Sequence, residues 1–298
     1  MSFHKKLLEW FEENRRPFPW RENTNPYNVW LSEVILQQTR AVQGLPYYMR
    51  LVSAFPTVED LANASEDEIM RLWQGLGYYS RVRNLHATAK KITKQHKGKF
   101  PKDFTTIKKF KGIGDYTASA ISSICFDQEQ AVVDGNVYRV LSRIYGIDQP
   151  IDSSGAYKLF KQKAQILMKG SPPGNFNQAI MEFGAIQCVP QNPNCKDCIF
   201  RSSCFAFQQG KVSLFPIKSK KVKVKGRYLH YLVLLDTSKK TIIERRKGKG
   251  IWQNLYQFPM IETQKKQEYF DDVEIKSLLT KHKIVGDFEI TKWNLQPI

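Results

Sequence analysis

The stretch FKGIGDYTASAI (residues 110–121) carries most of the information about the fold. Gly112 and Gly114 flank Ile113 directly before a run of small and apolar residues that predicts a helix. Glycine permits a tight turn and lets a backbone approach a ligand closely. The first N–H groups of the following helix would suit a phosphate, and Lys111 would add a positive charge. A glycine pair is also common at corners between helices, so a purely structural turn is the alternative.

A second stretch, AVVDGNVYRVLSR (residues 131–143), places Asp134 between a short apolar run and the glycine that opens a predicted helix. By itself Asp134 is explained as a helix N-cap. Glu33 is a second carboxylate in an unusual setting, because partial burial in the apolar segment VWLSEVILQQTR would raise its pKa and keep a proton available. An exposed helix position is the alternative for Glu33.

The composition favours a polyanionic partner. The chain has 298 residues, with 46 Lys and Arg against 28 Asp and Glu, a formal charge of +18 and a pI near 9.6. Nucleic acid is the first expectation and an anionic membrane surface the second. No run approaches the roughly 20 apolar residues that span a bilayer, and the charged N-terminus lacks the apolar centre of a signal peptide. We therefore expect a cytoplasmic protein.

The chain divides by composition into two domains and a linker. Residues 1–210 are predicted to be mostly helical, and Ser65 followed by Glu68 forms a capping-box pattern. Residues 211–227 hold seven basic residues and no acidic one, which indicates a linker. Residues 228–298 contain β-rich apolar runs separated by polar turns. The fold class expected is mostly α, followed by a smaller α/β domain.

Four of the five cysteines lie within residues 188–204, in the spacing C-x6-C-x2-C-x5-C. They are Cys188, Cys195, Cys198 and Cys204. In a cytosolic chain such crowding indicates a metal centre rather than disulfides. Structural zinc usually shows two close pairs, whereas an iron–sulfur cluster accepts uneven spacing. Zinc stays the alternative, and Cys125 is expected to be an ordinary buried thiol.

Taken in order, these features resemble the endonuclease III and adenine glycosylase superfamily of helix-hairpin-helix glycosylases. The stretch PFPWRENTNPYNVWLSEVILQQTR (residues 17–40) is similar to its adenine-specific branch, the A/G-mismatch glycosylases. The resemblance implies a helix-hairpin-helix at about residues 108–122 and a [4Fe–4S] cluster held by the four cysteines in the loop 188–204. This sequence departs from the family pattern at Phe110 and Lys111, where the usual hairpin has leucine and proline.

The resemblance also implies a Nudix-like C-terminal domain over residues 228–298, which we expect to be incomplete. The stretch W-x-N-L-x-x-F-P carries this likeness, at Trp252, Asn254, Leu255, Phe258 and Pro259. We find no Nudix hydrolase box and no F-S-H-like loop, the lesion-reading element of the family. Pyrophosphatase activity is therefore not expected, and the missing loop bears on discrimination of 8-oxoguanine more than on excision of adenine.

The family's catalytic roles fall on four residues of this chain. By resemblance, Glu33 protonates the adenine, Asp134 stabilises the cationic sugar, Asn136 helps to position water, and Tyr116 supports the nucleophile side. Bifunctional relatives carry a lysine at the position of Tyr116, and a phenol cannot form the Schiff base that a lyase needs. Tyr116 therefore predicts a monofunctional glycosylase.

Further residues match the family's contacts with base and DNA. Reaching the base requires flipping it from the duplex and filling the gap. The base pocket is expected to be lined by Trp20, Arg21 and Gln178. Contacts with the opened duplex are expected from Gln37, Gln38, Thr39, Leu76 and Tyr78. Phosphate contacts are expected from Lys111, Gly112 and Gly114, with Arg81 and Arg83 as further backbone contacts.

The expected function is hydrolysis of the N-glycosidic bond of adenine mispaired with 8-oxoguanine or guanine in double-stranded DNA. An endonuclease III-like or thymine-mismatch glycosylase is the nearest alternative. A DNA-binding iron–sulfur module without catalysis is an alternative from another class. We expect a monomer, without a membrane partner, that is cytoplasmic and nucleoid-associated as in bacteria.

Overall fold

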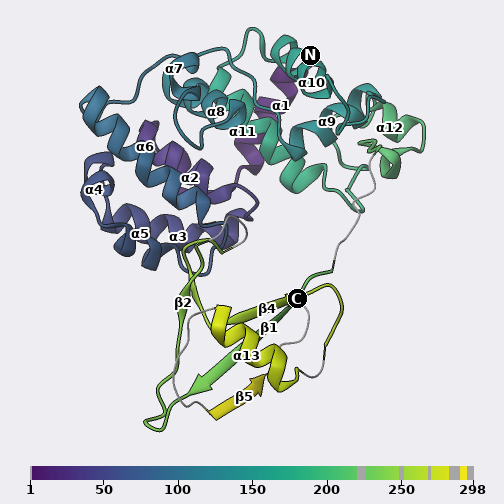
Figure 1. Cartoon of the computed structure of the whole chain (residues 1–298). Coiled ribbons are helices and arrows are strands. Elements are labelled where there is room, and N and C mark those ends of the chain that lie inside the picture. The colour runs from purple at the N-terminus through teal and green to yellow at the C-terminus, as the bar shows by residue number, and fades with distance from the viewer. Residues whose placement is uncertain (1, 220–225, 248–251, 268–269, 282–288, 294–298) are drawn as a thin grey trace. The chain divides into compact units, whose positions relative to one another are not determined.

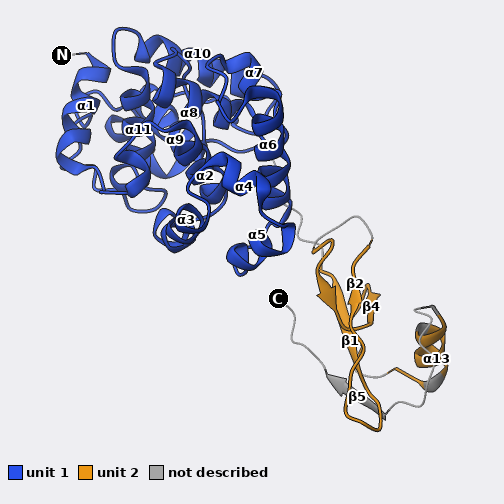
Figure 2. Cartoon of the chain, turned by 90° about the vertical axis from the view of Figure 1, so that its left-hand side faces the viewer, with its two compact units in different colours: residues 1–221 blue, residues 222–298 orange. Residues whose placement is uncertain are grey.

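The computed structural model of the chain describes residues 2–219, 226–247, 252–267, 270–281 and 289–293. The chain forms two compact units, residues 1–221 and 222–298, shown in different colours in Figure 2. The division between them lies within the basic stretch 211–227, of which residues 220–225 fall outside the described residues. Each unit is considered by itself below.

The first unit is helical, as the sequence predicted (Figure 1). Its α-helices are α1 (Phe3–Asn14), α2 (Pro26–Leu36), α3 (Ala41–Ala54), α4 (Val58–Asn63), α5 (Glu66–Trp73), α6 (Ser80–His96), α7 (Phe104–Lys108), α8 (Asp115–Phe126), α9 (Gly135–Tyr145), α10 (Ala156–Met168), α11 (Pro173–Glu182) and α12 (Phe205–Gln208). Shorter helical segments are η1 (Pro19–Arg21), η2 (Phe183–Gln187) and η3 (Val212–Leu214). In the part of the chain that the structure describes, no helix is both long and apolar enough to cross a membrane.

Two hydrophobic cores meet along α8. One core contains Trp30 of α2 and Trp73 of α5, and the other contains Phe176 and Phe183 beside α1 and α9. Ile124 of α8 packs against both. The alanines and serines of α8 give it little bulk, so helices can approach it from several sides. A functional cavity at this junction can therefore draw side chains from both halves of the unit.

Helix starts in the first unit follow from local sequence. Asn25 accepts a hydrogen bond from the N–H of Tyr27 at the start of α2, where Pro26 occupies the first helical position. The capping box predicted at Ser65 and Glu68 is confirmed at the start of α5. These caps fix the direction in which each helix leaves its loop.

The second unit is a small sheet with a helix, which confirms the expected smaller α/β domain. Strand β1 (Tyr228–Leu235) pairs antiparallel with β4 (Met260–Thr263) on one side and with β5 (Glu289–Trp293) on the other. Strands β2 (Glu244–Arg245) and β3 (Tyr256–Gln257) form a separate ribbon, and α13 spans Asp272–Lys281. The predicted domain 228–298 is described only in part, since 248–251, 268–269, 282–288 and 294–298 lie outside the described residues.

Candidate active site

A cavity of about 600 Å³ opens in the first unit among η1, α2, α8, α11 and the turn before α9. The cavity is lined by eight of the predicted site residues: Trp20, Arg21, Glu33, Thr39, Tyr116, Asp134, Asn136 and Gln178. These residues come from segments far apart in the sequence, so the fold brings them together. The volume is in the range of pockets that enclose small ligands.

Glu33 is buried in α2, with 8% of its surface exposed. Burial raises the pKa of Glu33 to about 7, and the nearby charge of Asp134 adds to the rise. A hydrogen bond with Tyr116 and the charge of Arg21 act in the opposite direction. A carboxyl group with a pKa near 7 holds a proton over much of the neutral range and can serve as a general acid.

Asp134 caps α9 and also faces the cavity, so the two interpretations of this residue are compatible. Its Oδ1 accepts the N–H of Val137 at 2.8 Å, and its Oδ2 accepts a hydrogen bond from Nδ2 of Asn136 at 2.8 Å. Burial raises the pKa of Asp134, and these hydrogen bonds, together with the charge of Arg139, counteract the rise. The cap fixes the carboxylate at the cavity wall.

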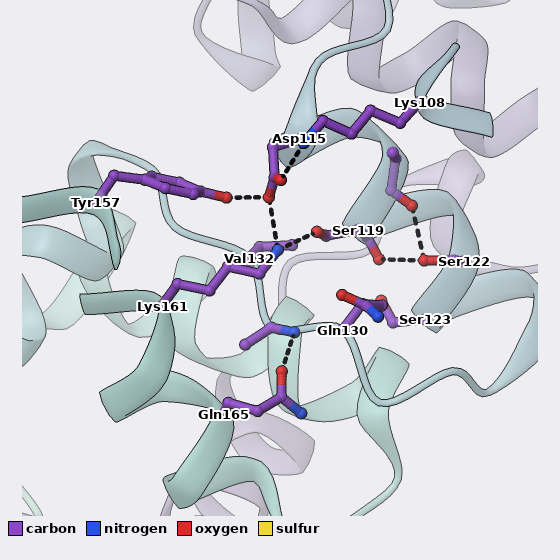
Figure 3. Close-up of polar contacts among 12 residues, drawn as sticks. Lys108, Asp115, Ser119, Ser122, Ser123, Gln130, Val132, Tyr157, Lys161 and Gln165 are labelled. Carbon is purple, nitrogen blue, oxygen red and sulfur yellow. Dashed lines mark hydrogen bonds and ion pairs between the residues drawn. The ribbon is translucent and has the colours of Figure 1, made fainter. Parts of the chain in front are cut away.

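The chain leading to Asp134 is held by buried side-chain amides. Oε1 of Gln165 accepts the N–H of Ala131 at 3.0 Å (Figure 3). The amide of Asn177 accepts the N–H of Val132 at 3.0 Å and donates to the carbonyl of Gln130 at 2.7 Å. These bonds satisfy backbone groups of an extended segment that pairs with no strand among the described residues, and they fix the position of the Asp134 turn.

A second chain of bonds runs from Asn136 towards the cysteines. Arg139 donates to Oδ1 of Asn136 at 2.8 Å, to the carbonyl of Gly184 at 2.7 Å and to the carbonyl of Cys188 at 2.7 Å. A Cβ atom added at Gly184 would lie 2.6 Å from Cβ of Asn136. Glycine is therefore required for η2 to lie this close to Asn136.

Tyr116 is partly buried at the start of α8, and its burial together with the charges of Glu33 and Asp134 raises its pKa. Its hydroxyl donates to Sδ of Met181 at 3.1 Å and also interacts with the carboxyl of Glu33. Tyr116 thus contacts the sulfur of Met181 and is close enough to both carboxyl groups for their charges to act on it. The cavity lining, as far as the structure describes it, includes arginines but no lysine.

Sequence reasoning missed Glu182 and Arg16, which also line the cavity. Glu182 is 1% exposed and accepts paired hydrogen bonds from Arg16, at 2.7 and 2.7 Å, and from Arg21, at 3.1 and 2.8 Å. Burial alone would raise the pKa of Glu182, but the two guanidinium groups lower it to about 2. Glu182 is the one charged residue in the apolar run IMEFGAI, and this pattern could have indicated a buried functional carboxylate. The same kind of pattern drew attention to Glu33.

The residues expected to fill the opened duplex differ in whether they line the cavity. Thr39 lines the cavity, whereas Gln37, Gln38, Leu76 and Tyr78 do not. Gln38 has φ 58° and Tyr78 has φ 47°, a left-handed backbone that is uncommon outside glycine. Tyr78 is 60% exposed, while Leu76 is buried in the core.

The expectation that Arg81 contacts the DNA backbone is wrong. Its side chain is buried, and its guanidinium donates to the carbonyls of Val34 at 3.1 Å and Ile35 at 2.9 Å. It also donates to the carbonyls of Gln37 and Leu76. Arg81 therefore ties the end of α2 to the turn between α5 and α6, because carbonyls at a helix end lack partners within the helix.

The glycine-containing hairpin joins α7 to α8. Gly112 has φ +79°, and a Cβ there would lie 2.7 Å from Cβ of Asn84, so glycine is needed for both reasons. Oγ1 of Thr88 donates to the carbonyl of Lys111 at 2.9 Å and holds the turn. Gly114 caps α8, and the space beside its Cα is open. The backbone there is accessible to a ligand, which is the property expected of a phosphate-binding hairpin.

Asp115, the first residue of α8, joins three helices (Figure 3). Its carboxylate pairs with Lys108 of α7 at 2.8 Å and with Lys161 of α10 at 2.5 Å, and it accepts the hydroxyl of Tyr157. Burial would raise the pKa of Asp115, but these three partners lower it to about 2. The network fixes the hairpin against α10.

Two of the four clustered cysteines contact Arg143: Cys188 lies beside its guanidinium, and Sγ of Cys204 donates to its backbone carbonyl at 3.4 Å. Nη1 of Arg143 lies 3.6 Å from Sγ of Cys188 and donates to the carbonyl of Val189 at 2.7 Å. Burial raises the pKa of Cys198 to about 11, and charges on the other three cysteines add to the rise. Among the residues with a described position, no three His, Cys, Asp or Glu side chains are close enough to hold a single metal ion.

The arrangement of hairpin, Asp134 turn and cavity agrees with comparisons with known proteins. Residues 31–165 match the family model described as HhH-GPD superfamily base excision DNA repair protein. The adenine DNA glycosylase of Buchnera aphidicola subsp. Baizongia pistaciae is 34% identical over 260 residues, which cover 87% of this chain and 74% of that protein. This chain belongs to the adenine DNA glycosylase family.

A further adenine DNA glycosylase and two solved structures of other glycosylases extend the comparison. The adenine DNA glycosylase of Rattus norvegicus is 44% identical over 227 residues, covering 72% of this chain and 44% of that protein. A solved structure of a thermostable thymine-DNA glycosylase matches with a TM-score of 0.64 at 27% identity, covering 70% of this chain and 95% of that one. A non-covalent endonuclease III–DNA complex matches with a TM-score of 0.60 at 19% identity, over 70% and 94%, which supports the fold.

Proposed function

We propose that the protein removes adenine from DNA by hydrolysis of its N-glycosidic bond, with adenine opposite 8-oxoguanine or guanine as the substrate. The observation that carries the proposal is one cavity lined by a carboxyl group whose pKa is about 7 and by a second carboxylate fixed as a helix cap. Membership of the adenine DNA glycosylase family agrees with this assignment.

In this proposal Glu33 acts as the general acid. It gives its proton to a ring nitrogen of the flipped adenine while the bond between C1′ and the base breaks, so the bonding electrons leave with a neutral base. The pKa of about 7 makes the protonated form available near neutral pH. Glu182, with Arg21 beside it, supplies further hydrogen-bonding groups in the same cavity for the edge of the base.

Asp134 stabilises the positive charge that develops on the sugar. Burial raises its pKa in the free protein, but a cation placed against it favours the ionised form. Asn136, held by Asp134 and Arg139, positions the water that adds to C1′, and the carboxylate left on Glu33 after it protonates the base accepts the proton that this water releases. Tyr116 lies near both carboxyl groups and offers no amine for a Schiff base, so the proposed enzyme is monofunctional.

We further propose that Cys188, Cys195, Cys198 and Cys204 hold a [4Fe–4S] cluster. The four thiols influence one another's pKa, and the buried Arg143 beside Cys188 offsets the charge of thiolate ligands. Iron–sulfur clusters of this type take four cysteine ligands. The cluster would hold the loop 188–204 in shape, and Lys196 and Arg201 in that loop would suit DNA phosphates.

DNA binding is assigned to the hairpin and to the exposed turns. Lys111, Gly112 and Gly114 would contact phosphates, while Gln37, Gln38, Thr39 and Tyr78 would contact the opened duplex. Leu76 would require the turn between α5 and α6 to rearrange, since it is buried here. A monomeric, cytoplasmic and nucleoid-associated enzyme completes the proposal.

A mismatch panel tests this function. Iron-loaded protein is incubated with labelled duplexes that carry A opposite 8-oxoguanine, G, C or T, and with a T:G duplex, and abasic sites are then cleaved with alkali. Cleavage of the adenine strand opposite 8-oxoguanine and G is expected, without borohydride trapping of the protein. Cleavage of the T:G duplex alone, or efficient trapping, would instead support a thymine-mismatch glycosylase or a lyase.

A further inference from the structure

The mouth of the cavity is formed by those of its lining residues that are exposed. Glu33 and Glu182, which also line the cavity, are buried and belong to its floor. The exposed lining residues are Arg40, Val42, Ala185 and Pro190. Among these four described residues Arg40 is charged and the other three are apolar. The mouth therefore presents one cation and no carboxylate.

Arg40 differs from the other three arginines that line the cavity. Arg16 and Arg21 both donate to the carboxylate of Glu182. Arg139 donates to two backbone carbonyls and to a side-chain amide. The guanidinium of Arg40 forms no hydrogen bond or ion pair with any residue that the structure describes. Its donors are therefore available to a ligand at the mouth.

A flipped nucleotide would bring negative charge to this mouth. The base enters the pocket, while the phosphates on either side of it stay joined to the duplex outside. Because an ionised group is costly to bury without partners, these phosphates belong at the exposed edge rather than on the floor. A guanidinium offers planar paired donors that match two phosphate oxygens. Arg40 thus has the charge and the geometry that such a phosphate needs.

We propose that Arg40 binds a phosphate directly adjoining the flipped nucleotide and so holds the DNA backbone at the cavity mouth. The inference rests on the proposed function, since that function requires a flipped nucleotide in this cavity. The contact is separate from those proposed for the hairpin, because Lys111, Gly112 and Gly114 do not line this cavity.

The salt dependence of binding tests whether Arg40 neutralises a phosphate. The ligand is a duplex with 8-oxoguanine opposite tetrahydrofuran, an abasic analogue that has no base to excise, and the Kd of iron-loaded protein is measured by fluorescence anisotropy. Arg40→Gln should reduce the steepness of log K against log salt concentration by about 0.9. If the two proteins bind equally at about 1 M salt, the Kd of the variant at about 0.1 M is roughly eightfold higher. Arg40→Lys keeps the charge and should keep the wild-type slope.

Uncharged methylphosphonates locate the contact. One is placed at the phosphate on the 5′ side of the tetrahydrofuran residue, or at the phosphate on its 3′ side. At one of these positions the methylphosphonate should weaken binding by the wild type and leave binding by Arg40→Gln unchanged, because the two changes remove the same interaction. Arg50→Gln, at an exposed arginine of α3 outside the cavity lining, is the matched control. It should respond to the methylphosphonate as the wild type does.

The proposal is overturned if Arg40→Gln keeps the wild-type salt slope, or if neither methylphosphonate weakens the wild type. It is also overturned if both methylphosphonates weaken the variant as much as the wild type, since Arg40 would then only add to the general positive charge. Absence of adenine excision by the wild type from an A:8-oxoguanine duplex would instead reject the proposed function. The binding series uses DNA without the adenine, so the two failures are distinguishable.

Discussion

Replacing Glu33 by glutamine should make the protein more stable, and increasingly so as the pH rises. Glu33 has a pKa of about 7 in the folded protein against an ordinary value of 4.5. Between these values the native state holds a proton that the unfolded chain has lost, so the stability of the wild type falls as pH rises through this window. Below about pH 4.5 both states are protonated and the cost disappears.

The magnitude follows from the difference between the two pKa values. Each pH unit inside the window costs the wild type about 1.4 kcal/mol of unfolding free energy. Between pH 5.5 and 8 the cost grows by about 2 kcal/mol, because it stops growing above the native pKa. Glutamine carries no charge, so the Glu33→Gln variant does not lose this unfolding free energy as the pH rises. For a unit of this size, the gap in melting temperature between Glu33→Gln and wild type should widen by about 4–8 °C.

Thermal unfolding followed by circular dichroism provides the assay. Both proteins carry the same amount of iron, and their melting temperatures are compared at each pH. The difference between variants removes effects of pH on the rest of the molecule. Glu9→Gln, at an exposed position of α1, is the matched control and should show no widening. A gap for Glu33→Gln that stays constant from pH 5.5 to 8 would refute the reasoning, since it would mean that Glu33 does not titrate in this range.

Three further predictions concern stability, packing and metal. Glu182→Gln should lower the unfolding free energy by about 3 kcal/mol in denaturant titrations at pH 7, because it breaks buried pairs with two arginines; an unchanged midpoint would contradict this. Gly184→Ala should reduce excision at least tenfold by displacing Asn136, whereas Gly226→Ala should not. Cys198→Ser should remove bound iron in elemental analysis while Cys125→Ser retains it; stoichiometric zinc in the wild type would reject the cluster.

The local features of the site were predictable from the sequence. An apolar segment around one carboxylate indicated burial of Glu33, with an exposed helix position as the alternative, and an aspartate before a helix predicted the cap at Asp134. The capping box at Ser65 and the turn at Gly112 likewise depend on neighbours a few positions away. Such features are set by local backbone requirements, which sequence patterns record directly.

Contacts between distant segments were not predictable in the same way. Glu182 bonds Arg16 across 166 positions, and no local pattern pairs them. Arg81 was expected on the DNA side because an arginine in a basic protein is usually exposed, but carbonyls at the end of α2 bind it inside. These roles depend on which segments the fold brings together.

The central claim is that Asp134 acts as an anion against the sugar, beyond capping α9. Asparagine caps helices as well as aspartate does, so Asp134→Asn preserves the cap and removes the charge. The decisive measurement compares binding and excision by this variant on an A:8-oxoguanine duplex. The account predicts a Kd within a few-fold of wild type and an excision rate lowered by at least about a hundredfold. Retained excision, or an equal loss of binding and excision, would contradict it.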